Sequence, residues 1–137
     1  VKPEIEVFDV GMIYNALYYL RKGFLQAPLH FNLVLGAAGG IAATVENLVF
    51  MKSLLPADAT WSAFGIGRGH LPILYATLAL GGHLRVGMED NVLYDRGVLA
   101  ESNAQFVERS KRIVKEFNME LATPDEARQM LGLKRHH

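Results

Sequence analysis

The sequence predicts an α/β fold of four consecutive βα units followed by a terminal helix. Short runs that favour strands alternate with segments that favour helices, which is typical of a parallel sheet with helical crossovers. The expected strands begin near residues 4, 29, 60 and 83. A complete (β/α)8 barrel needs about 250 residues, so four units in 137 residues amount to roughly half a barrel. The alternative is an open four-stranded sheet, whose two edges need cover.

Capping and stop signals give the boundaries of the elements. Strands are expected at residues 4–9, 29–35, 60–66 and 83–89, and helices at 12–22, 45–54, 70–80 and 103–117, with a last helix from residue 123. The first helix ends in the cations Arg21 and Lys22, before Gly23, and glycine commonly ends helices. Thr44 can cap the second helix, because its hydroxyl can accept from free backbone N–H groups.

Similar signals delimit the later elements. Gly81-Gly82 ends the third helix, and Ser102 or Asn103 can cap the fourth. The segment Thr123-Pro124-Asp125-Glu126 is a capping box with proline at the first helical position, and Gly132 closes this last helix. No linker or low-complexity tract interrupts the order, so we expect one unit, residues 1–137.

Composition excludes several classes of protein. Half of the residues are hydrophobic, which excludes a disordered chain, and 14 Lys and Arg balance 14 Asp and Glu, so the basic excess of a nucleic-acid binder is missing. No apolar run approaches the roughly 18 residues of a membrane span. The absence of cysteine excludes thiolate zinc sites and disulfides. We therefore expect a cytoplasmic protein that binds neither nucleic acid nor membrane. Because the chain does not begin with Met, we also expect its natural start to be missing.

Successive side chains of a strand point to opposite faces, and the two faces of the expected strands differ in polarity. The apolar faces carry Ile5 and Val7; Leu29, Phe31, Leu33 and Leu35; and Leu84, Val86 and Met88. The opposite faces carry Glu4 and Glu6; His30, Asn32 and Val34; and His83, Arg85, Gly87 and Glu89. The third strand is less clear. The apolar faces suit packing under helices.

In a barrel the charged face points inward, where charges are costly unless they are paired or bound to a metal. Glu6, Arg85 and Glu89 therefore form a candidate site; the alternative is a structural ion pair between Glu6 and Arg85. Asp90 follows Glu89 at the expected strand end, so the two carboxylates point in different directions. One could bind a metal while the other does acid–base work, and the alternative is a solvated loop with a helix cap.

Two glycine clusters follow expected strands, at Gly36–Gly40 and Gly65–Gly69. Glycine lets backbone amides approach an anion, and Arg68 could add charge for a phosphate. Neither cluster fits a Rossmann or Walker motif, and tight strand-to-helix turns are the alternative. Of the five histidines only His136-His137 are closely spaced, so the histidines give no complete metal site; His30 and His83 are expected to be structural.

Several motifs resemble the β-keto acid cleavage enzymes, the family typified by 3-keto-5-aminohexanoate cleavage. The clearest is the run Gly81-Gly82-His83-Leu84-Arg85-Val86-Gly87-Met88-Glu89-Asp90-Asn91, which is similar to the family's last-strand signature. Others are PEIEVF at residues 3–8, PLHFNLVLG at 28–36, ATW at 59–61, GIGR at 65–68, GVLAESNAQ at 97–105 and ATP at 122–124. Together these motifs cover essentially the whole chain, in order.

The resemblance implies a zinc-dependent (β/α)8 barrel of which this chain supplies strands five to eight. The family reaction converts a β-keto acid and acetyl-CoA into acetoacetate and a new acyl-CoA. Glu89 matches the carboxylate zinc ligand, Asp90 and Arg85 match the polar pair that activates the reactants, and Glu6 matches a further active-site carboxylate on the fifth strand. The glycine-rich strand ends, represented by Gly39, Gly40, Gly67 and Arg68, would accept parts of the CoA arm.

The chain also departs from the family pattern. The two histidine zinc ligands, in a His-x-His pattern, and the Ser and Thr of the substrate site belong to the family's N-terminal half, which this chain does not resemble. One carboxylate is not a zinc site, since catalytic zinc normally has about three protein ligands. Gly69 stands where relatives commonly carry bulkier side chains.

These observations support three hypotheses. The first is the C-terminal half of such an enzyme, inactive alone and completed by the N-terminal half of the same barrel or by a second copy of the chain, most simply within a homo-oligomer. The second is a non-catalytic half-barrel that covers its sheet edges by self-association. The third is an anion- or phosphate-binding module that uses the segment from Gly65 to Arg68.

Overall fold

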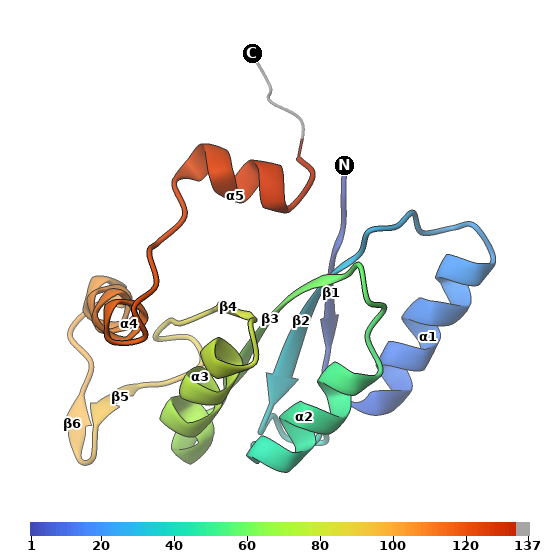
Figure 1. Ribbon diagram of the computed structural model, residues 1–137. Coiled ribbons are helices and arrows are strands. Elements are labelled where there is room, and N and C mark those ends of the chain that lie inside the picture. Colours follow the sequence, from blue (N-terminus) through green and yellow to red (C-terminus); the bar gives the residue numbers. More distant parts are fainter. Residues whose placement is uncertain (134–137) are drawn as a thin grey trace.

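The computed structural model describes residues 1–133, so His136 and His137 lie outside the described residues. Its main feature is a parallel sheet in the order β1-β2-β3-β4 (Figure 1). The strands are β1 (Glu4–Val7), β2 (His30–Leu35), β3 (Thr60–Gly65) and β4 (His83–Leu84), and the helices are α1 (Val10–Arg21), α2 (Val45–Ser53), α3 (His70–Ala79), α4 (Asn103–Glu116) and α5 (Pro124–Met130). Helices connect the successive strands, which confirms the predicted α/β fold with a parallel sheet.

Helices α1, α2, α4 and α5 begin at polar side chains that accept from free N–H groups of the first turn, whereas α3 follows Gly69 without a side-chain cap. Thr44 accepts from Asn47, as predicted, and Ser102 accepts from the backbone of Gln105, which decides between the two expected caps of α4. The predicted capping box of α5 is present, with both of its hydrogen bonds. Helix α1 begins earlier than expected, because Asp9 caps it by accepting from the Met12 N–H at 3.0 Å.

The apolar strand faces pack under the helices, as predicted. Phe31, Leu33 and Leu35 of β2 are fully buried, in one core with residues of the three crossover helices. These helix residues include Ile13 of α1, Leu48 and Met51 of α2, and Ile73 of α3. Trp61 and Ala63 belong to the same core, so they lie on the helix-covered face of β3, the strand whose faces the sequence left unclear. A smaller cluster of Leu74, Leu78, Ile113 and Val114 joins α4 to α3.

The predicted strand 83–89 is wrong in extent, because β4 contains only His83 and Leu84. Both pair with β3, opposite Ser62 and Ala63, but β4 has no strand on its other side among residues 1–133. An edge strand with one short ladder has little to hold it extended. The chain turns at Gly87 instead, whose carbonyl accepts from the N–H groups of Asp90 and Asn91.

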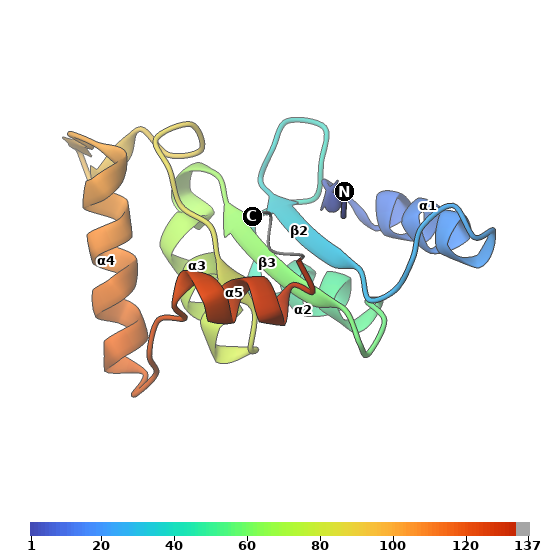
Figure 2. The same ribbon diagram turned by 90° about the horizontal axis from the view of Figure 1, so that it is seen from above.

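The sequence did not reveal a short antiparallel hairpin of β5 (Leu93–Asp95) and β6 (Val98–Leu99) after this turn. The turn between the two strands contains Gly97 at a φ of 74°. The run Asp95-Arg96-Gly97 is the sequence signal that could have predicted this turn. Helix α5 lies above the starts of the strands in Figure 1 and crosses in front of the sheet when seen from above in Figure 2. Just after this helix, the Leu131 carbonyl accepts from Lys2 Nζ at 2.7 Å. Within the described residues, no helix is both long and apolar enough for a membrane span.

Candidate functional site

Arg85 lies directly after β4 and contacts three carboxylates. Its Nη1 donates to Glu6 Oε1 at 2.9 Å, while its Nη2 lies 3.9 Å from Glu89 Oε2 and its Nε lies 3.8 Å from Asp90 Oδ2. The guanidinium also stacks over the Phe64 ring, 4.5 Å from its centroid. The structure thus brings together the four predicted residues Glu6, Arg85, Glu89 and Asp90.

The contact between Arg85 and Glu6 carries information on the shape of the sheet. Strands β2 and β3 lie between β1 and β4, so Glu6 and the end of β4 are three strand spacings apart, about 14 Å in a flat sheet. Strand side chains stand roughly perpendicular to the sheet, so in a flat sheet the ends of these two side chains would stay far apart. Their direct hydrogen bond at 2.9 Å indicates that the sheet curves toward the face that carries Glu6. We call this face, opposite the helices α1–α3, the polar face; it carries Glu6, Asn32, Ser62 and Phe64.

A row of hydrogen bonds crosses the polar face and ends at Glu6. The register places Glu6 beside Asn32 and Asn32 beside Ser62. Asn32 Nδ2 donates to Glu6 Oε1 at 3.1 Å, and Ser62 Oγ donates to Asn32 Oδ1 at 2.9 Å. Sequence reasoning placed Asn32 on this face but gave it no role. The signal was a lone amide within the otherwise apolar run FNLVL.

Asp90 is the most buried of the three carboxylates around Arg85. Its side chain is only 10% exposed, and this burial raises the pKa of Asp90, with Arg85 acting against the shift and Glu89 and Glu6 adding to it. A carboxyl whose pKa is raised beside a fixed cation is suited to taking up and returning a proton. The side chain of Glu89 is 85% exposed, so it remains available to a ligand.

Asn91 fixes the segment that follows Asp90, a feature that the sequence did not reveal. Asn91 is buried, and its Nδ2 donates to the Gly65 carbonyl and to His70 Nδ1, each at 3.1 Å. His70 must therefore accept at Nδ1 and is neutral in this arrangement. Burial lowers the pKa of His70, and Arg109 adds to this effect, which agrees with a neutral ring.

The described residues do not by themselves fit a zinc centre. Within residues 1–133 no group of three or more His, Asp or Glu side chains is placed to hold a metal ion. His30 and His83 lie at the starts of their strands with ring centroids 6.4 Å apart, and His30 bonds to Thr60 Oγ1 at 2.8 Å. Glu89 remains as a single candidate ligand, fewer than the roughly three protein ligands of a catalytic zinc site.

The predicted anion-binding glycines lie after β2 and β3, at the end of the sheet where Arg85 follows β4. Gly39 and Gly67 have φ angles of 80° and 63°, with open space where a Cβ would be. Gly40 is a packing glycine, because a Cβ there would meet the Phe8 carbonyl at 2.8 Å. Arg68 is exposed. The backbone is therefore open at Gly39 and Gly67, while the positive φ angles of these glycines also suit the tight turns considered as the alternative.

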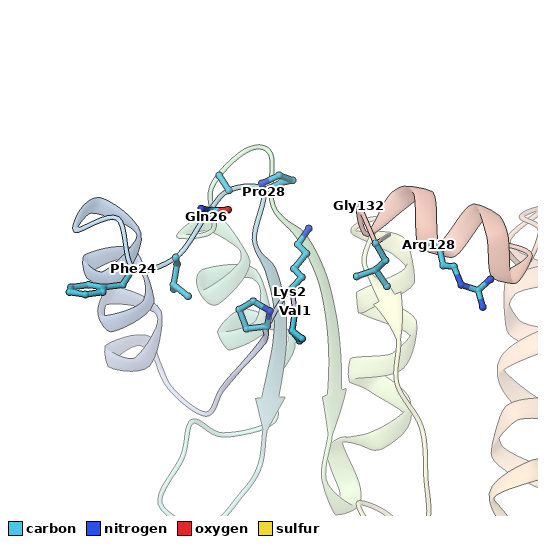
Figure 3. Close-up of a pocket in the computed structure, with 11 residues that line it drawn as sticks. Val1, Lys2, Phe24, Gln26, Pro28, Arg128 and Gly132 are labelled. Atoms are coloured by element: carbon cyan, nitrogen blue, oxygen red, sulfur yellow. The ribbon is translucent and has the colours of Figure 1, made fainter. Parts of the chain in front are cut away.

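A cavity of about 1040 Å³ lies at the opposite end of the sheet (Figure 3). It is lined by the first residues of the chain, the loop before β2, and α5 with the residues after it. Its two cationic side chains are already engaged, since Lys2 donates to the Leu131 carbonyl and Arg128 pairs with Asp125. In α/β proteins with parallel sheets, ligands bind at the carboxyl ends of the strands, so the Arg85 cluster is the better candidate site.

Comparison with known proteins gives consistent results. The family model of the beta-keto acid cleavage enzymes matches residues 1–133. The chain is 50% identical over 135 residues to a 3-keto-5-aminohexanoate cleavage enzyme of Fusobacterium nucleatum, with 98% of this chain and 49% of that protein covered. It is 40% identical over 137 residues to a 3-oxoadipate:acetyl-CoA acetyltransferase of Cupriavidus necator, with 97% of this chain and 48% of that protein covered.

A solved structure supports the fold. The apo structure of ObcA superposes with a TM-score of 0.80 at 18% identity, over 97% of this chain and 37% of that chain. The chain spans about half the length of the curated relatives it matches. Since the family model covers nearly all of its residues, the chain belongs to the beta-keto acid cleavage enzyme family.

Proposed function

We propose that the whole protein containing this chain cleaves a β-keto acid with acetyl-CoA, giving acetoacetate and a new acyl-CoA. Family membership and the names of relatives such as the 3-oxoadipate:acetyl-CoA acetyltransferase support this reaction class. The observation that carries the proposal is the cluster in which Arg85 joins Glu6 to Asp90. It combines a fixed cation for an anionic substrate with a carboxyl suited to proton transfer.

Each member of the cluster has a distinct role in this proposal. Arg85 orients the substrate carboxylate and stabilises negative charge that develops during cleavage. Asp90 moves the proton, because partial burial raises the pKa of Asp90 and so favours proton uptake. Glu6 holds Arg85 through the shortest of the three contacts of the guanidinium.

We assign Glu89 as the ligand that this chain would contribute to a zinc ion, and the other ligands must come from outside the described residues. The exposure of its side chain supports this assignment. Gly39, Gly40, Gly67 and Arg68 are the proposed contacts of the CoA arm, because they lie in loops at the same end of the sheet as Arg85.

We further propose that the chain forms strands five to eight of a barrel. In the described residues β1 and β4 each pair on one side only, and the sheet curves toward the polar face, so both edges are open to further strands. Either the N-terminal half of the same barrel or a second copy of the chain would complete the barrel. We expect the assembled protein to be a homo-oligomer. The chain alone should then be inactive, because it lacks the rest of the site.

The test is acetoacetate formation from acetyl-CoA and a panel of β-keto acids by the whole protein. We expect turnover in the wild type, and a loss of about 100-fold or more in Arg85→Ala, which removes a charge that acts in the transition state. Arg96→Ala is the matched control, because Arg96 is exposed in the β5–β6 turn and should leave turnover unchanged. Absence of turnover with every β-keto acid, or equal turnover in Arg85→Ala, would contradict the proposal.

A further inference from the structure

Asn32 is the central member of the row on the polar face, with one partner on each side. Ser62 donates to its carbonyl oxygen, and its own amide nitrogen donates to Glu6. The Glu6 oxygen that accepts from Asn32 is Oε1, which also accepts from Arg85. A continuous path of hydrogen bonds therefore runs from Ser62 through Asn32 and Glu6 to Arg85.

The amide of Asn32 can adopt only one orientation. The reverse orientation would place its carbonyl oxygen against the Glu6 carboxylate, where two acceptors would meet. Asn32 is fully buried and Ser62 is 6% exposed, so neither is open to a substrate. A buried amide with partners at both ends is held rigidly, because losing either bond leaves a polar group unsatisfied.

Glu6 needs this support because its own surroundings are open. The side chains of Glu6 and Arg85 are 41% and 35% exposed, and ion pairs with this degree of exposure are individually weak. Glu89 and Asp90 also lie within 4.0 Å of the guanidinium, so three carboxylates compete for it. The carboxylate that is fixed in place decides where Arg85 points.

We propose that Asn32 is a positioning residue: held by Ser62, it fixes the Glu6 carboxylate, and Glu6 in turn holds Arg85 in reach of Asp90. This inference rests on the proposed function, in which Arg85 and Asp90 act on the substrate. It assigns a task to two residues that touch neither substrate nor metal. Loss of Asn32 would free Glu6 to turn toward solvent and let Arg85 settle on other carboxylates.

The same sheet face supplies a matched control. Two residues earlier on each strand, Thr60 bonds to His30, and His30 Nε2 lies 3.8 Å from Glu4 Oε1. This row has the same geometry, since Glu4 pairs with His30 and His30 with Thr60 in the register. No hydrogen bond or ion pair links this row to Arg85 in the described residues. Thr60→Ala therefore removes a comparable hydroxyl contact without touching the path to Arg85.

The test measures kcat and KM for the whole protein with Asn32→Ala, Ser62→Ala, Ser62→Thr and Thr60→Ala. We expect Asn32→Ala to lower kcat about 10- to 100-fold with little change in KM, because a displaced Arg85 loses stabilisation of the transition state. Ser62→Ala should lower kcat about tenfold or less, with no further loss in the Asn32→Ala background, as expected for two members of one path. Ser62→Thr keeps a hydroxyl at this position and should keep kcat near the wild-type value, and Thr60→Ala should match the wild type.

The order of the Arg85 side chain provides a second readout that does not depend on turnover. Relaxation of its ¹⁵Nε signal should show a rigid guanidinium in the wild type and in Thr60→Ala, and a mobile one in Asn32→Ala and Ser62→Ala. If Asn32→Ala does not fold, the comparison of Ser62→Ala with Ser62→Thr tests the positioning role instead, since only the first of these variants removes the hydroxyl.

The two readouts separate the two proposals. An inactive wild type overturns the proposed function, and the Arg85 signal then decides the positioning role by itself. An active wild type with unchanged kcat in Asn32→Ala and Ser62→Ala overturns the positioning role alone. An Arg85 side chain that stays equally rigid in these variants also overturns it.

Discussion

Glu89 and Asp90 are adjacent in the chain, yet their side chains are 85% and 10% exposed. The turn at Gly87 produces this difference, because it ends the extended backbone and directs the two side chains to different surroundings. Asp90 turns toward the protein, where burial raises its pKa, and Glu89 extends outward. The two neighbouring carboxylates therefore have different surroundings, which suit them to different tasks.

Replacing the exposed carboxylate should affect metal binding. We expect Glu89→Gln in the whole protein to lower zinc affinity about 10-fold or more, because it removes an anionic ligand. Zinc content after dialysis against a graded chelator measures this. Glu101→Gln is the control, since Glu101 is an exposed carboxylate before α4. Equal zinc contents in the wild type and Glu89→Gln would contradict the ligand assignment.

Replacing the partly buried carboxylate should affect turnover instead. Asp90→Asn keeps the shape of the side chain but cannot accept a proton at the same position, so we expect kcat to fall about 100-fold or more. Zinc content should remain at the wild-type level. The diagnostic result is the opposite response of the two neighbouring variants. A variant Asp90→Asn with full turnover would exclude Asp90 as the group that moves the proton.

The backbone at Gly69 lies close to Ala43, and this close approach predicts the effect of a larger side chain on stability. A Cβ at Gly69 would lie 2.3 Å from the Ala43 Cβ, so Gly69→Ala should destabilise the protein by about 1–3 kcal/mol through overpacking. Gly87→Ala is the matched control, since the nearest atom to its added Cβ is 3.5 Å away. Urea unfolding of both variants measures the difference. A stable Gly69→Ala protein would show that these loops can separate without cost.

The buried side chain of His70 should make the stability of the protein depend on pH. Burial holds the pKa of His70 below its usual value, so the unfolded chain binds a proton more readily than the folded one. The contribution of His70 to stability is therefore complete above about pH 6.5 and is lost as pH falls below that value. We expect the free energy of unfolding to fall less between about pH 7.5 and about pH 5 in His70→Gln than in the wild type. Parallel pH profiles for the two proteins would contradict this.

The open sheet edges predict how the chain behaves by itself. The purified 137-residue chain should show negligible turnover, and turnover should appear with a polypeptide that completes the barrel. Native mass spectrometry with parallel assays tests both statements. Activity of the isolated monomer would overturn the prediction. A stable dimer without zinc or activity would favour the self-associating half-barrel instead.

Much of the fold could be predicted from the sequence because its determinants are local. The cap at Thr44 and the capping box at Thr123 depend on residues three positions apart, and both are present as predicted. The alternation along β2 placed Phe31 in the core and Asn32 on the opposite face. The extent of β4 was predicted wrongly, since the length of an edge strand depends on partners that its own residues do not specify.

The sequence by itself determined the order of the βα units, the polar and apolar faces of the strands, and the candidacy of Glu6, Arg85, Glu89 and Asp90. Only the tertiary structure decided that Arg85 bonds to Glu6, 79 residues away in the chain, rather than to its neighbour Glu89. It also placed Asn32 and Ser62 behind Glu6. The physical reason is that periodicity fixes the face on which a side chain lies, while the curvature of the sheet and the pairing of distant strands decide which side chains meet.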